Sequence, residues 1–141
     1  MKTCSCKAII RSSGIFDIAL MLPFAIPGIA AWVLSQLQYI HESLAFSGSF
    51  PEFSGLHLLF VSLMAIITIV WSFLRYREPL VIYGVYDSIA RFGIITLMLV
   101  YTVYFDVSGV ILVFLCVELA WLLLQINALQ FKREGHSLLA S

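Results

Sequence analysis

Four ionisable side chains stand inside stretches of otherwise apolar sequence: Asp17, Asp87, Arg91 and Glu118. An ionised group in hydrocarbon is costly, so such residues usually face the interior of a helix bundle and pair with one another. Asp87 and Arg91 are four residues apart, which places them on one face of a helix. One guanidinium can hold two carboxylates through its fork of N–H donors. The chemistry open to these residues is charge pairing, proton exchange at a carboxylate, or both.

The depth of each residue predicts which of them meet. At a rise of about 1.5 Å per residue, Arg91 lies about 21 Å from Arg77, which precedes its segment, and Glu118 lies about 21 Å from Lys132, which follows its segment. We therefore predict a buried cluster in which Arg91 stands between Asp87 and Glu118, with Asp17 nearer the cytoplasm. Two interpretations stay open: the cluster only fixes helix packing, or it also serves a substrate or a proton.

The elements that must position these residues are long apolar segments. The chain has 141 residues, of which 62% are hydrophobic and 11% charged, and its mean hydropathy of +1.02 is far above that of soluble domains. Four segments reach the length of about 20 residues that a bilayer core requires, namely 14–34, 56–74, 83–105 and 109–129. They lack the alternation of strands. The sequence predicts a single all-α domain over residues 1–141, an integral membrane four-helix up-down bundle.

The distribution of basic residues predicts the orientation. Every Lys and Arg that flanks a segment lies on one side, whereas the two loops on the other side contain none and carry Glu42, Glu52, Asp106 and His41. The positive-inside rule then makes the N- and C-termini cytoplasmic, in a multi-pass protein of the cell (inner) membrane. The flanking residues are Lys2, Lys7, Arg11, Arg75, Arg77, Lys132 and Arg133.

A cleaved signal peptide is the rival interpretation of the first segment, because a basic region precedes an apolar run. The apolar run is longer than a signal core and contains Asp17, Pro23 and Pro27, which favours a retained span. The loop after it, QLQYIHESLAFSGSFPEFSG, could hold a short interfacial helix. The third connection is expected to be a tight turn around FDVSG.

The prolines of the first segment also point to a pocket. Each proline removes a backbone hydrogen bond and can kink the helix, and the freed carbonyls must find partners or line a cavity. In the fourth segment, Glu118 shares one helical face with Trp121 and Gln125. We predict a pocket lined by Pro23, Pro27, Gly28, His57, Met64, Trp121 and Gln125.

The second segment carries a stripe that includes Thr68, Trp71 and Arg75. Trp71 lies one turn from Arg75, so it is expected to anchor the helix at the cytoplasmic interface.

The three cysteines, Cys4, Cys6 and Cys116, give no disulfide framework and no complete metal site. A net charge of zero gives no reason to expect nucleic-acid binding. No cofactor is predicted, and the sequence leaves open whether the protein binds a quinone or a lipid.

Three sequence stretches carry a family resemblance: WSFLRYREP after the second segment, YDSIARFG in the third and VELAWLLLQ in the fourth. With these, the chain resembles the DoxX-like group of small four-helix bacterial membrane proteins. Its second helix, LHLLFVSLMAIITIVW, departs from the Glu- and Gly-rich pattern of that group. The resemblance implies a four-helix bundle, and some members of the group are accessory subunits of quinone-coupled oxidation.

Three functions are compatible with these features. The first is a non-enzymatic subunit or a binder of a small hydrophobic ligand. Its expected partners are membrane lipid and either further copies of the chain, in a homo-oligomer, or the other subunits of a larger membrane complex. The alternative is a proton- or cation-coupled small-molecule exporter that uses the buried Glu118. The third is a quinone- or lipid-linked membrane enzyme or accessory subunit, which His41, Glu42 and His57 could serve as acid–base groups. The sequence contains no recognisable catalytic constellation, which favours a role other than catalysis.

Overall fold

The structure, a computed structural model, describes the backbone of residues 2–137 and the side chains of residues 6–130. Within that range all the named secondary-structure elements are helices, with no strand, which confirms the all-α prediction. The side chains of Lys2, Cys4, Lys132 and Arg133 lie outside the described residues. The elements are α1 (Lys2–Met21), the 3-10 turn η1 (Leu22–Ala25), α2 (Pro27–Ser43), α3 (Gly55–Arg77), α4 (Val81–Tyr104) and α5 (Ile111–Ser137).

Four helical stretches in the described chain are long and apolar enough to cross a membrane: Cys6–Ala25, Gly55–Arg77, Val81–Tyr104 and Ile111–Gln130. The last three coincide with the predicted spans 56–74, 83–105 and 109–129 to within a few residues. Large apolar side chains cover their outer faces, among them Ile67, Val103 and Phe92, each more than half exposed. Such surfaces suit contact with lipid, so the chain is a small multi-pass membrane protein.

The first predicted span, 14–34, is corrected by the structure, because the chain turns in its middle. Pro23 lies in η1, and Pro27 begins α2 after Ile26, whose backbone is extended (φ −109°, ψ 112°). A residue before proline is driven out of the helical region by the proline ring, so two prolines four apart end one helix and start another. The span-length helix therefore lies earlier, at Cys6–Ala25, and residues 27–34 belong to α2.

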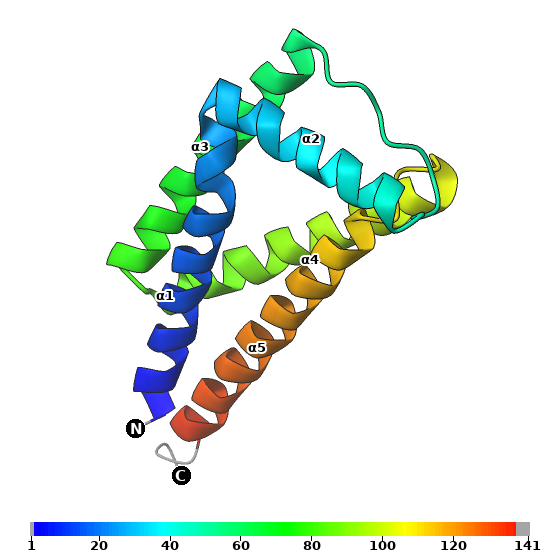
Figure 1. Ribbon diagram of the computed structural model, residues 1–141. Helices are drawn as coiled ribbons and strands as arrows, with labels where there is room; N and C mark the ends of the chain where they lie inside the picture. The colour runs from blue at the N-terminus through cyan, green and yellow to red at the C-terminus, as the bar shows by residue number, and fades with distance from the viewer. Residues whose placement is uncertain (1, 138–141) are drawn as a thin grey trace.

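The helices form two pairs that diverge from the end where the chain begins (Figure 1). Helix α1 packs along α3, and α4 packs along α5, while α1 also contacts α5 and α4. Helices α3 and α4 separate from their short connection instead of packing as neighbours. Helix α2 runs from the far end of α1 and α3 to the turn between α4 and α5, so it closes the third side of a triangle.

The contact between α1 and α3 depends on glycine at position 14. A Cβ atom at Gly14 would lie 2.7 Å from the backbone oxygen of Ser72, so a side chain here would force the two helices apart. Buried Ser13, Ser62 and Ser72 line the same pair of helices. Small residues of this kind let membrane helices approach closely. The close approach sets the next turn of α1 against the C-terminal part of α3.

The loop after α2 is tied to the turn between α4 and α5, which is the tight FDVSG turn that the sequence predicts. The backbone N–H of Ser49 donates to Asp106 O (2.7 Å), and that of Ser108 donates to Ser49 O (2.9 Å). Gly48 has φ +84°, and a Cβ there would lie 2.5 Å from Val107 O, so only glycine fits. These bonds hold the far end of α2 against the α4–α5 pair.

Candidate functional site

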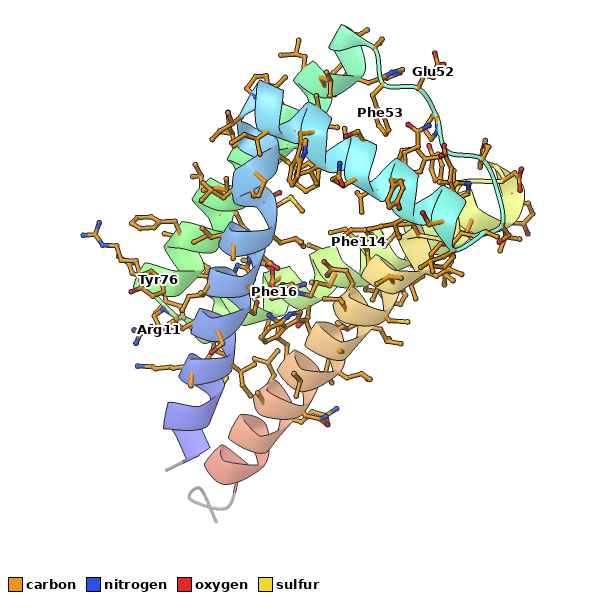
Figure 2. The ribbon with its side chains drawn as sticks, in the orientation of Figure 1. Arg11, Phe16, Glu52, Phe53, Tyr76 and Phe114 are labelled. Carbon is orange, nitrogen blue, oxygen red and sulfur yellow. The ribbon has the colours of Figure 1, made fainter. Side chains whose placement is uncertain are left out.

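Five charged side chains from four helices meet where α1, α3, α4 and α5 converge. We call this set the charge cluster, and its members are Asp17, Arg75, Asp87, Arg91 and Glu118. Their side chains are between 1% and 14% exposed. Phe16, labelled in Figure 2, precedes Asp17 on α1, and its ring packs against Trp121 of α5 with 5.5 Å between ring centroids.

Asp17 bridges the two guanidiniums. Its Oδ2 atom accepts from Arg75 Nη2 at 2.6 Å and from Arg91 Nη2 at 2.5 Å. Since Asp17 is on α1, Arg75 on α3 and Arg91 on α4, one carboxylate oxygen joins three helices. Charge-assisted hydrogen bonds of this length are the stronger kind in proteins.

Asp87 has the most donors of the three carboxylates. Its Oδ2 atom lies 2.6 Å from Arg75 Nη1 and 3.0 Å from Arg91 Nε. The Gln125 side-chain amide donates to the same oxygen at 2.6 Å, and Trp71 Nε1 donates to Oδ1 at 3.2 Å. The Ser13 hydroxyl of α1 also donates to Oδ2, at 3.4 Å, so five side chains from four helices satisfy this carboxylate, which is only 5% exposed.

Glu118 is held more loosely than the other two. Its Oε2 atom accepts from Arg91 Nη1 at 2.5 Å, and Arg91 is its one ion-pair partner among the described side chains. The Glu118 side chain is also the most exposed of the three carboxylates, at 14%. The asymmetry separates Glu118 from the two aspartates, which each bind both arginines.

Neutral side chains complete the cluster. Ser13 Oγ accepts from Arg75 Nη1 at 2.7 Å and from Gln125 Nε2 at 2.9 Å, and Ser72 Oγ accepts from Arg75 Nη2 at 2.7 Å. Every nitrogen of Arg91 donates to a cluster member, whereas Arg75 Nε is buried with no partner among the described residues. The guanidiniums are therefore almost saturated by the protein itself.

The charges of the cluster do not cancel. Three carboxylates and two guanidiniums carry a net charge of −1 when all are ionised, since 2 − 3 = −1. An unbalanced charge in a low-dielectric interior is unfavourable unless a proton or a counter-ion neutralises it.

A cavity of about 290 Å³ opens beside the cluster, in the space left where α3 and α4 diverge. One end of it is charged, and the remaining walls are apolar. This volume is close to the lower end of the range for small-molecule sites. The lining residues are Asp17, Leu20, Met21, Ile67, Thr68, Trp71, Arg75, Asp87, Ala90, Arg91, Ile94, Met98 and Glu118.

The structure brings together all four ionisable residues that the sequence predicts as a cluster. Gln125 also belongs there, through its bonds to Asp87 and Ser13. Trp121 instead packs on Phe16, and Met64 lines a separate apolar groove of about 400 Å³ with Phe24 of η1 and Phe60 of α3. None of these three lines the cavity beside the cluster.

The remaining predicted pocket residues lie away from the charge cluster. Pro23 is half-buried in η1, while Pro27 and Gly28 are exposed at the start of α2. His57 is exposed near the start of α3, where its Nδ1 atom accepts from the Ser54 backbone N–H at 3.2 Å as part of a helix cap. The two prolines redirect the chain without lining the cavity that the structure shows next to the cluster.

Sequence reasoning missed Arg75, Trp71, Ser13 and Ser72. Arg75 stands at the end of an apolar segment, where the sequence predicts a cytoplasmic flanking residue, but its side chain points inward and is buried. Trp71, expected to be an interfacial anchor, donates to Asp87 and lines the cavity. The signal was the stripe of Thr68, Trp71 and Arg75 on one face of the segment, since all three line the cavity.

Comparisons with family models, curated proteins and solved structures give no match to this chain. Within the described residues, no three His, Cys, Asp or Glu side chains are arranged to hold a metal ion. The carboxylates of the cluster face guanidiniums, so the arrangement can hold charge and exchange a proton.

Arg75→Leu is expected to destabilise the protein by about 3–5 kcal/mol, because it leaves two buried carboxylates short of a counter-charge. Arg77→Leu, two residues further and exposed, is the matched control and is expected to change stability little. Reversible unfolding in mixed micelles measures both. Equal stability of the two variants would contradict the cluster.

Proposed function

We propose that this chain is a non-enzymatic membrane protein that binds a small, mostly apolar ligand in the cavity between α3 and α4. The observation that supports it is the cavity of about 290 Å³ with apolar walls and one charged end. Small-molecule sites are typically apolar with a few polar groups that fix orientation. Here Leu20, Ile67 and Ile94 would contact the body of the ligand, and Glu118 and Trp71 would meet its polar group.

The stretches behind the resemblance to the DoxX-like group supply this site. WSFLRYREP contains Trp71 and Arg75, YDSIARFG contains Asp87 and Arg91, and VELAWLLLQ begins with Val117 and Glu118. We propose the resemblance on these three stretches, each of which contributes residues to the lining of the cavity. A quinone or a lipid is one class of occupant that it implies.

The orientation belongs to the same proposal: both termini face the cytoplasm, and the α2 end of the molecule faces outward. Lys7, Arg11 and Arg77 are exposed at the end where α1 begins. There Arg11 Nε donates to Tyr76 O at 3.1 Å, and the two side chains project together from α1 and α3 (Figure 2). Arg75 is neutralised inside the cluster, so the positive-inside argument rests on the exposed residues.

Cysteine labelling tests the orientation. A membrane-impermeant maleimide added to intact cells is expected to modify Glu52→Cys, in the loop after α2, and to leave Arg77→Cys unmodified. The unsubstituted chain is the control for its own three cysteines. If only the Arg77→Cys variant were labelled, the orientation would be the opposite of the one proposed.

Filling the cavity tests the binding function. Ala90 is on α4 and lines the cavity, whereas Ala120 of α5 is exposed and is not one of the lining residues. Native mass spectrometry of protein extracted in mild detergent is expected to show a bound small molecule on the wild type and on Ala120→Trp. Ala90→Trp is expected to lose it, because the indole occupies the space. Equal amounts of bound small molecule on Ala90→Trp and Ala120→Trp, or no bound molecule on the wild type, would contradict the proposal.

A further inference from the structure

The unbalanced charge of the cluster limits which ligands can enter the cavity. Asp17 of α1, Arg75 of α3, Asp87 and Arg91 of α4 and Glu118 of α5 are the ionisable groups that line it, and together they carry −1. A neutral state therefore needs one proton or one bound cation.

Glu118 is the carboxylate placed to take that proton. Asp17 accepts from two guanidiniums, and Asp87 accepts from two guanidiniums, an amide, an indole and a hydroxyl. Each of these donors stabilises the ionised form. Glu118 has Arg91 alone and is the most exposed of the three, on the wall of the cavity.

The arginines leave little room for an anionic ligand. Every nitrogen of Arg91 already donates within the cluster, and so do both Nη atoms of the buried Arg75, which leaves only Arg75 Nε without a partner among the described residues. An anion would also add to the existing negative charge. A cation, by contrast, would complete the charge balance. The Arg75 guanidinium already lies over the Trp71 ring, with Cζ 5.8 Å from the ring centroid, so it is the net charge of the cluster that favours a cationic ligand.

We propose that the ligand is a monovalent organic cation with an apolar body, and that it binds in exchange for a proton on Glu118. Without ligand, Glu118 is protonated and the cluster is neutral. When the cation binds, the carboxyl proton leaves to the solvent, and the cluster of charge −1 is neutralised by the ligand of charge +1. This inference rests on the proposed function, since it names the class of ligand for the same cavity.

The test uses the full chain in lipid nanodiscs and two probes of one shape. Benzyltrimethylammonium carries a fixed charge and no exchangeable proton, so any proton released must come from the protein. Neopentylbenzene, in which carbon replaces the nitrogen, is its neutral counterpart. Titration calorimetry in two buffers of different ionisation enthalpy counts the protons released, with empty nanodiscs as the baseline.

We expect the wild type to bind the cation in preference to the neutral probe and to release about one proton per cation bound, with affinity rising by up to about tenfold per pH unit while Glu118 is protonated. Glu118→Gln is expected to abolish both the proton release and the pH dependence. Glu52→Gln, an exposed loop change, should behave as the wild type. If Glu118→Gln fails to fold, the proton exchange is tested by measuring how the affinity for the cation depends on pH in the wild type and in Glu118→Asp, which retains the carboxyl. Both proteins are then expected to show the pH dependence.

The outcomes separate this inference from the proposed function. Cation binding without proton release, or tighter binding of the neutral probe, would overturn the exchange and leave the ligand-binding cavity standing. Binding of neither probe by a folded wild type that also carries no co-purified small molecule would overturn both.

Discussion

Ionised side chains inside a membrane protein must neutralise one another, because neither lipid nor a dry interior can solvate them. In this chain the requirement falls on residues from four different helices, and a single oxygen of Asp17 binds arginines from two of them. Apolar faces alone cannot specify how helices associate within lipid, which solvates them equally well from any direction. The charge cluster therefore fixes which helices meet, and at what depth.

The same constraint explains why a cavity exists. Arg91 ties α4 to Asp17 of α1 and Glu118 of α5, and Arg75 ties α3 to Asp87 near the start of α4, while Gly14 lets α3 approach α1. Beyond this contact, helices α3 and α4 run in different directions from their short connection, and the space between them opens next to the charged groups. The packing of the helices and the cavity beside the charge cluster are consequences of one arrangement.

The proposed exchange of a proton on Glu118 for a bound cation would also be the step that a proton-coupled exporter requires.

The sequence predicts the part of the site that follows from periodicity and depth. Asp87 and Arg91 share a helical face because they are four apart, and Glu118 lies at the depth of Arg91. It could not place Arg75, because a basic residue at the end of an apolar segment fits both a cytoplasmic flank and an inward-pointing partner. It also treated Pro23 and Pro27 as a kink, although together with the extended Ile26 they separate two helices. The direction of α2 depends on contacts between residues 47–49 and 106–109, which periodicity does not encode.

The most direct test of this account is a double-mutant cycle between Asp17 on α1 and Arg75 on α3, whose side chains lie 2.6 Å apart. The free energy of unfolding is measured for Asp17→Ala, Arg75→Ala and the double variant in mixed micelles. If the cluster ties the helices together, the two changes are strongly non-additive, with a coupling energy above about 1 kcal/mol. Additivity to within about 0.3–0.5 kcal/mol would show that the two residues are not partners and would contradict the account.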